Sequence, residues 1–290
     1  MSERIALFKG KHSHTKSHHI RERIGRTDFL VGKIDKPSDV RPDDRAVIIN
    51  GGDGTARRVI AALPQDFNGD VLLWPAGTNN ALARAVSIGP NGADNVLPLE
   101  TLGSFLNEGT SLPVYFPGQI RSETFITDVG VGATEGQIAE HNRALRKFMH
   151  DILTGRVRIP LAALITALNY LMREQSIEEP AFDLYSVGPD YGRKRMFETD
   201  IWGKDITNVR VESTDSKLDT FGRLVLTYMC LGLGMKSRLP AVADVSVSQR
   251  FEVTHSIGPY MNSGSQGESF IDTPTTVQRS TRGIKIATLT

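Results

Sequence analysis

The segment NGGDGT, residues 50–55, limits most strongly what this chain can fold into. It joins an apolar run at 45–50 to a helix-like run at 55–64. Glycines without a Cβ tolerate positive φ and allow backbone N–H groups to approach an anion. The helix that follows adds N–H donors and a positive dipole end. The segment therefore predicts either a phosphate-binding loop or a tight turn in which Asp53 caps the next helix.

Asp53 needs a separate explanation, because a carboxylate beside phosphate is repelled unless a cation lies between them. Mg²⁺ held by a carboxylate and by phosphate oxygens would meet this need. Asp53 is also a candidate to accept a proton from an attacking hydroxyl. The segment is neither a G-x-G-x-x-G dinucleotide fingerprint nor a P-loop with Gly-Lys-Ser/Thr.

A second loop of similar design follows one strand later, in PAGTNNALAR at 75–84. Pro75 and Gly77 shape a turn, while Thr78 and Asn80 supply a hydroxyl and an amide that can bind phosphate or ribose oxygens. Both loops follow predicted strands and precede predicted helices. In a parallel sheet they would meet at the carboxyl ends of the strands, where α/β proteins bind ligands.

The pattern of elements differs between the two parts of the chain. The first part alternates strands and helices, which predicts parallel βαβ units in an α/β domain over residues 1–112. Strands are predicted at 4–8, 45–50 and 70–77, and helices at 55–64, 79–87 and 98–109.

The second part, residues 113–290, has short strand candidates between turn-forming residues, as is typical of an antiparallel β-sandwich. The candidates are 111–116, 121–130, 181–188, 208–213, 223–232, 250–257 and 283–289, with inserted helices at 135–153 and 158–173. The last strand either belongs to this domain or returns to the first sheet.

The two loop motifs together resemble the catalytic domain of the diacylglycerol kinase family, which includes bacterial lipid kinases and sphingosine kinases. NAD kinases share the first motif and a related fold. The resemblance implies an N-terminal nucleotide-binding α/β domain and a C-terminal β-sandwich domain, with ATP between them. A weaker third motif, QGE at 266–268, stands where the family carries Asp-Gly-Glu.

The resemblance also implies roles for individual residues. Asp53 would hold Mg²⁺ or transfer a proton, and Glu268 would be a candidate base for a lipid hydroxyl. The residues expected to contact the nucleotide are Gly51, Gly52, Gly54, Thr55, Gly77, Thr78 and Asn80. Phosphoryl transfer requires mainly positioning and charge neutralisation, so this set is a plausible minimum.

Several positions depart from the family pattern. The opening Asn-Pro-x-Ser-Gly loop is replaced by FKGKHSHTKSHH, residues 8–19, and the second motif has Ala81 in place of Asp. Gln266 replaces the Asp of the third motif, and DTFGRL at 219–224 replaces a structural Mg²⁺ loop. These departures leave open an active lipid kinase and a non-catalytic nucleotide- or lipid-binding homologue. A soluble kinase of the NAD-kinase type is the third alternative.

The basic and apolar segments each have two interpretations. The histidines of residues 12–19 form either a solvated loop or a weak metal site, and Lys9, Lys11 and Lys16 are candidates to reach ATP phosphates. The apolar run at 159–172 is either a core helix or a lipid-facing helix. Five cationic residues flank it: Arg143, Arg146, Lys147, Arg156 and Arg158.

Composition limits the partners. A net charge of +1 argues against a dedicated nucleic-acid binder, and the single cysteine, Cys230, excludes an intramolecular disulfide. No apolar run is long enough to cross a bilayer, and no signal-peptide core is present. We therefore expect a cytoplasmic protein, and the resemblance to diacylglycerol kinases implies a lipid substrate and peripheral membrane contact. A homodimer is left open.

Overall fold

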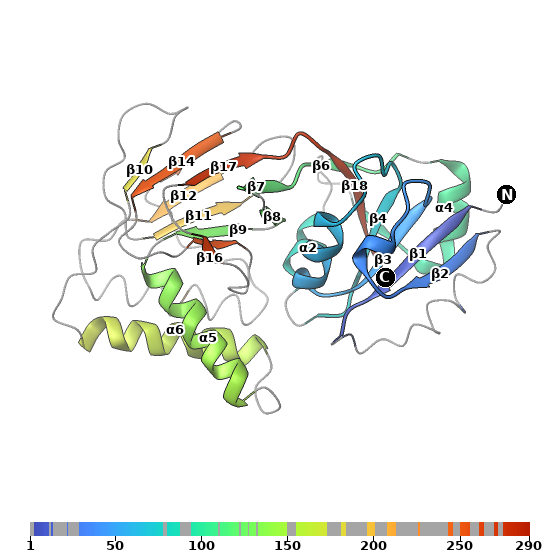
Figure 1. Ribbon diagram of the computed structural model, residues 1–290. Helices are drawn as coiled ribbons and strands as arrows, with labels where there is room; N and C mark the ends of the chain where they lie inside the picture. The colour runs from blue at the N-terminus through green and yellow to red at the C-terminus, as the bar shows by residue number, and fades with distance from the viewer. Residues whose placement is uncertain are drawn as a thin grey trace. The chain divides into compact units, whose positions relative to one another are not determined.

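The computed structural model divides the chain into two units, which are described separately (Figure 1). Unit 1 comprises Met1–Pro117 and Thr281–Thr290, and unit 2 comprises Gly118–Ser280. The structure describes residues 3–11, 13, 22, 29–77, 80–87, 94–109, 111–121, 123–126, 128–131, 133–149, 155–172, 181–183, 196–200, 208–212, 226, 243–245, 250–255, 261–263, 270–271 and 275–290.

A mainly parallel sheet forms the centre of unit 1, as predicted (Figure 1). Its strands, in spatial order, are β2 (Leu30–Ile34), β1 (Arg4–Lys9), β3 (Ala46–Gly51), β4 (Asp70–Pro75), β18 (Ile284–Leu289) and β5 (Val96–Leu97). Short β6 (Val114–Tyr115) pairs antiparallel with β18. The central strands are apolar runs buried on both faces, which is the expected pattern for a parallel sheet.

Short helices connect the strands of unit 1. They are α2 (Asp53–Ala61), α3 (Ala81–Val86) and α4 (Leu102–Glu108), together with the 3₁₀ turns η1 (Pro37–Asp39) and η2 (Leu99–Thr101). Helix α4 ends at Gly109, whose φ of 65° is the left-handed conformation that glycine adopts at helix ends. Its buried Leu102 and Leu106 join Ile48 and Leu72 in the core.

The last strand, β18, belongs to the sheet of unit 1 and lies between β4 and β5. Asn95 fixes it by donating from Nδ2 to the carbonyl of Ile286 at 2.9 Å and to that of Val86 at 3.0 Å. The Thr288 hydroxyl donates to the carbonyl of Ala83 at 2.8 Å. The chain terminus thus supports α3, which carries the second loop motif.

Unit 2 contains two antiparallel sheets. One has the order β10 (Ala181–Asp183), β14 (Arg250–His255), β17 (Thr275–Arg279), β7 (Gly118–Ile120), β8 (Glu123–Phe125). The other has the order β13 (Ala243–Val245), β12 (Asn208–Glu212), β11 (Met196–Asp200), β9 (Asp128–Val131), β15 (Met261–Ser263), β16 (Phe270–Ile271). Their packing into a sandwich stays a prediction. The strand predicted at 223–232, with Cys230, falls outside the described residues except for Leu226.

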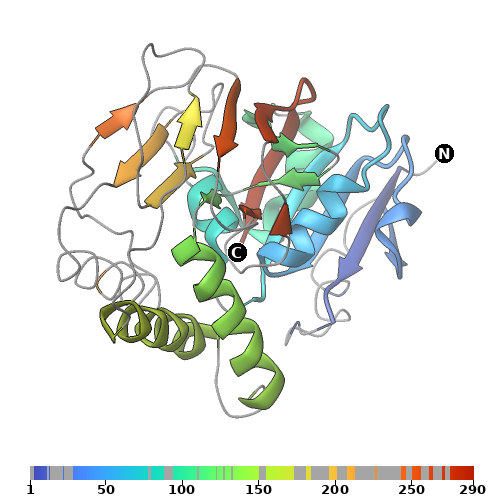
Figure 2. The same cartoon turned by 60° about the vertical axis from the view of Figure 1, so that its left-hand side comes forward.

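Two long helices, α5 (Ala133–Met149) and α6 (Gly155–Met172), belong to unit 2. They pack against each other (Figure 2), and α5 also packs on β9 and β15. In the part of the chain that the structure describes, no helix combines the length and apolar character needed to cross a membrane.

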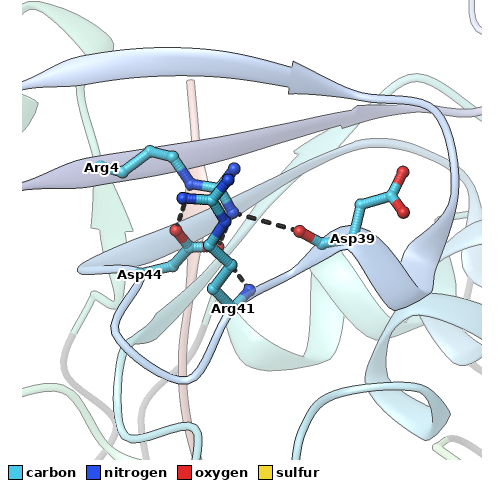
Figure 3. A network of polar contacts seen from close by, with 4 residues as sticks. All are labelled: Arg4, Asp39, Arg41 and Asp44. Carbon is cyan, nitrogen blue, oxygen red and sulfur yellow. Dashed lines mark hydrogen bonds and ion pairs between the residues drawn. The ribbon is translucent and has the colours of Figure 1, made fainter.

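An ion pair fixes the start of β1 in the first sheet (Figure 3). Arg4 of β1 donates from Nε and Nη2 to both oxygens of the Asp44 carboxylate, at 2.5 and 2.6 Å. The Arg41 backbone N–H donates to Asp44 Oδ2 at 2.8 Å, and Arg4 also donates to the Asp39 carbonyl at 3.1 Å. Since the Asp44 side chain is 1% exposed, this pair joins β1 to the loop that leads into β3.

We expect Asp44→Asn to lower the free energy of unfolding by about 3 kcal/mol, because it leaves a half-buried guanidinium without its counter-charge. Urea denaturation of the full chain measures the change. Asp35→Asn is the matched control, since Asp35 pairs with Lys33 on the surface and is 81% exposed. Equal transition midpoints for the two variants would contradict this account of the ion pair between Arg4 and Asp44.

Candidate functional site

Three loops meet at the carboxyl ends of β1, β3 and β4. The strand register pairs Lys9 with Asn50 and Gly51 with Pro75, so the three strands end at the same level. Strand β2 lies on one side of β1 and β3 on the other, which makes the β1–β3 junction the point where the strand order reverses. Open α/β sheets bind ligands outside the carboxyl ends at such a point.

The glycine-aspartate loop opens helix α2. Gly52 is the N-cap, and its carbonyl accepts the N–H groups of Thr55 and Ala56 at 2.9 and 3.0 Å. The N–H groups of Asp53 and Gly54, at the first two helical positions, therefore have no acceptor within the helix. They lie at the positive end of the dipole of a nine-residue helix, which favours an anion.

Gly51, Gly52 and Gly77 are needed for space and not for unusual dihedral angles. None of Gly51, Gly52, Gly54 or Gly77 has a positive φ, contrary to the expectation from the sequence. Instead, a Cβ on Gly51 would lie 2.6 Å from the Thr55 Cβ, and one on Gly77 would lie 2.4 Å from the Gly52 Cα. The two loops are thus in backbone contact, which only glycine permits.

Asp53 links the two loops directly. Its side chain is buried, and its Oδ1 accepts the backbone N–H of Leu82 at 2.9 Å. Leu82 occupies the second position of α3, so the carboxylate caps the helix that follows the second loop. The Ala76 N–H also donates to the Gly51 carbonyl at 3.1 Å. The expectation that Asp53 caps the helix that follows it in the chain is therefore wrong: Asp53 is the first residue of α2, and its carboxylate caps α3 instead.

Asn80 closes the second loop on itself. Its Oδ1 accepts the Gly77 N–H at 2.9 Å, and its Nδ2 donates to the Gly77 carbonyl at 2.8 Å. Asn80 has a φ of 51°, which asparagine tolerates better than most residues. The predicted contact of Asn80 with a nucleotide stays a prediction, and its present contacts shape the turn.

The loop after β1 completes this edge through Gly10, Ser13 and Asn50, to which the sequence analysis gave no role. The Gly10 N–H donates to the Asn50 carbonyl at 2.8 Å, and the Ser13 hydroxyl donates to Asn50 Oδ1 at 2.6 Å. A Cβ on Gly10 would lie 2.6 Å from Thr55 Oγ1, so Thr55 packs under this loop. The sequence features that could have identified these contacts are the glycine after the first strand and the asparagine before Gly-Gly. Lys11 is exposed beside them.

Two predicted site residues, Thr78 and Glu268, fall outside the described residues, as do Lys16 and the histidines at 12, 14, 18 and 19. Within the described part of the chain, no three His, Cys, Asp or Glu side chains are grouped to hold a metal. Asp53 is the single carboxylate in the two loop motifs, NGGDGT at 50–55 and PAGTNNALAR at 75–84. One carboxylate is enough to bind Mg²⁺ that is already coordinated by phosphate oxygens. It is too few ligands to bind Mg²⁺ without them.

We expect Gly77→Ala to destabilise the protein by about 2 kcal/mol, because the added methyl group forces the two loops apart. The matched control is Gly32→Ala on β2, where a Cβ would meet the flexible Arg4 side chain at an ordinary 3.6 Å. Thermal unfolding of both variants measures the difference. A Gly77→Ala protein as stable as Gly32→Ala would show that the loops are not in close contact.

Comparison with known proteins finds a family whose model covers both loop motifs. Residues 16–104 match the diacylglycerol kinase catalytic domain. A candidate diacylglycerol kinase from Bacillus anthracis str. Sterne has a similar structure, with a TM-score of 0.62, 12% identity, and 98% of this chain and 97% of that chain covered. A diacylglycerol kinase from the same organism gives a TM-score of 0.59 at 14% identity, with 96% of this chain and 94% of that chain covered.

No curated protein matches the sequence. At 12% and 14% identity, the two structural matches establish the fold alone. The match over residues 16–104 supports a kinase, that is, a phosphotransferase. The resemblance to the diacylglycerol kinase catalytic domain is therefore confirmed, and the chain has the mixed α/β fold of these solved structures.

Proposed function

We propose that this protein is an ATP-dependent lipid kinase that transfers the γ-phosphate to a hydroxyl of diacylglycerol or a related lipid. One observation carries the proposal: three loops touch one another at the β1–β3 switch point, and one buried carboxylate, Asp53, connects two of them. The family match over residues 16–104 supports phosphoryl transfer as the reaction.

The backbone of the glycine loop would bind the phosphates. Asp53 and Gly54 begin α2, and their N–H groups are hydrogen-bond donors at the positive end of the helix dipole. Binding through these backbone groups does not require a long side chain to lose its hydration. Lys11, exposed in the neighbouring loop, would add a cation. Mg²⁺ bound with ATP would neutralise the phosphate charge, and Asp53 is the residue that would hold it.

The transfer step requires no reactant other than ATP and the lipid. The lipid hydroxyl oxygen forms a bond to the γ-phosphorus, and the bond from that phosphorus to the bridging oxygen breaks. ADP leaves with the electron pair, and the hydroxyl proton passes to a carboxylate. Asp53 and Glu268 are the two candidates for that carboxylate.

A specific observation favours a second candidate function, a non-catalytic nucleotide- or lipid-binding protein. Asp53 Oδ1 and the Asn80 amide both serve the internal structure of the loops. If these two side chains have only this structural role, they hold the loops in shape and take no part in a reaction. Turnover measurements distinguish the two candidates.

We expect the full-length protein to transfer labelled phosphate from ATP to at least one lipid of a panel of diacylglycerols and sphingoid bases when Mg²⁺ is present. Asp53→Asn should lower turnover by about 100-fold or more, the scale of a lost acid–base or metal-binding group. Its Oδ1 can still accept the Leu82 N–H, so the melting temperature should change little. Asp53→Ala loses both the charge and the cap, and should be less stable as well.

Asp66→Asn serves as the control, because Asp66 is an exposed carboxylate in the loop that leads to the opposite end of β4. Full activity of Asp53→Asn would contradict the mechanism. ATP binding with no turnover on any lipid would favour the non-catalytic candidate, and activity on NAD instead of lipids would favour a soluble kinase.

A further inference from the structure

The chain passes between its two units twice. It leaves unit 1 after Pro117 and returns to it at Thr281. By these bounds Asp53 belongs to unit 1 and Glu268 to unit 2, so the proposed transfer takes its two candidate carboxylates from different units. The two crossings are the covalent links between those units. Contacts that hold the crossings within unit 1 are therefore candidates to position the groups that react.

Strand pairing is interrupted where the chain crosses. Within unit 1 the strands that flank the crossings pair through Tyr115 and Ile284, and within unit 2 they pair through Gly118 and Arg279. Two residues of the first crossing and four of the second lie between these pairs, so one ladder register cannot continue from unit to unit. Pro117 also lacks the N–H group that a ladder requires. Side-chain contacts are therefore needed to fix the crossings at this point.

Gly283 brings the second crossing against the first. A Cβ on Gly283 would lie 2.4 Å from Val114 Cγ1 and 3.1 Å from Phe116 Cε1, so a larger residue would displace the first crossing. Phe116 directly precedes Pro117, after which the chain leaves unit 1. The two crossings therefore leave unit 1 in close contact, and a residue that anchors the second crossing also restrains the first.

Arg282 ties the second crossing to the end of helix α2. Its Nη1 donates to the Leu63 carbonyl at 3.0 Å, and its Nη2 donates to the Phe67 carbonyl at 3.3 Å. Leu63 directly follows Ala62, the C-cap of α2, so the guanidinium lies where the dipole of the helix is negative. The Arg282 side chain is half-buried, and its two bonds span the turn that leads from α2 toward β4.

Helix α2 connects this anchor to the glycine loop. It spans Asp53–Ala61, and nine residues at about 1.5 Å each give a length of about 13 Å. Ala56, Val59 and Ile60 are buried in the core, so the helix responds as one packed element. The first N–H groups of α2 are those proposed to bind phosphate, and Arg282 holds the turn after its last residue. Arg282 and bound phosphate would thus interact with opposite ends of one helix.

We propose that Arg282 is a positioning residue for the proposed phosphoryl transfer, and this assignment rests on that function. Nucleotide bound at the start of α2 restrains the helix, and the helix, through Arg282, restrains the crossing at residues 280–283. The link to unit 2, which carries the candidate base Glu268, is thus ordered when nucleotide is bound. Arg282 lies at the end of α2 away from the glycine loop, so it acts through the helix and does not touch the reacting atoms.

Hydrogen exchange of the full-length protein, measured with and without ATP and Mg²⁺, tests the coupling. In the unmodified protein, ATP should slow exchange in the glycine loop and at residues 280–283 by about fivefold or more, the lower end of the usual coupling between two sites. Arg282→Met keeps a long side chain and loses every donor, so ATP should still protect the loop and no longer protect the crossing. Protection of the crossing that persists in Arg282→Met, or that is missing from the unmodified protein, would overturn the proposal.

Steady-state kinetics separates positioning from a purely structural role. Arg282→Met should lower kcat by about tenfold and leave KM for ATP within about twofold, because the glycine loop is intact and the placement of the reacting groups is not. A side chain that only stabilises the end of α2 would change the melting temperature and neither constant, and that result would overturn the proposal. The exchange measurement requires no turnover, so it tests the coupling whether or not a lipid is phosphorylated. Protection confined to the glycine loop would overturn the coupling and leave nucleotide binding standing, whereas no protection at either place would overturn both.

Two further variants complete the design. Arg45→Lys removes a similar bond, from Nη2 to the Leu106 carbonyl at 3.0 Å, and keeps a cation beside Asp70, so ATP should still protect the crossing. Loss of that protection in Arg45→Lys as well would show a general effect of lowered stability and overturn the proposal. If thermal unfolding shows that Arg282→Met is not folded, Arg282→Gln replaces it with the same expected loss, because its amide ends well short of the arginine Nη atoms.

Discussion

The hydrogen bond from the Leu82 N–H to the Asp53 carboxylate is the contact on which the arrangement of the candidate site depends. It joins the start of α2 to the start of α3, two helices that follow neighbouring strands. The bond is sheltered from water because Asp53 is 7% exposed, which makes it worth more than a surface contact. The close backbone contact between Gly52 and Gly77 restricts the spacing of the same two loops sterically.

A single carboxylate can thus have a structural use and a chemical one. The cap fixes where the carboxylate lies, and a fixed position is what phosphoryl transfer requires of a metal-binding or proton-accepting group. The same reasoning applies to β18, which returns from the end of the chain to support α3 through Thr288 and Asn95. Residues far apart in sequence therefore hold the two loops at one edge.

The sequence predicted the parts of the structure that depend on local pattern. Apolar runs ending in Gly-Gly or Pro-x-Gly marked β3 and β4, and the alternation with helices predicted the mainly parallel sheet. It did not predict the Asp53–Leu82 bond or the closure of the loop by Asn80, because these contacts depend on the tertiary spacing of the loops. The exposed side of α6 was also undecided, since a helix that is apolar almost all round carries little information about which face is buried.

The central claim is that the carboxyl edge of β1, β3 and β4 binds phosphate through backbone amides. Backbone amide NMR of the full-length protein during titration with ATP and Mg²⁺ tests it most directly. The account predicts that the largest chemical-shift changes fall on Asp53, Gly54 and the loop after β1. Changes concentrated at the opposite end of the sheet, around Arg45 and Asp70, or no saturable change at any amide, would contradict it.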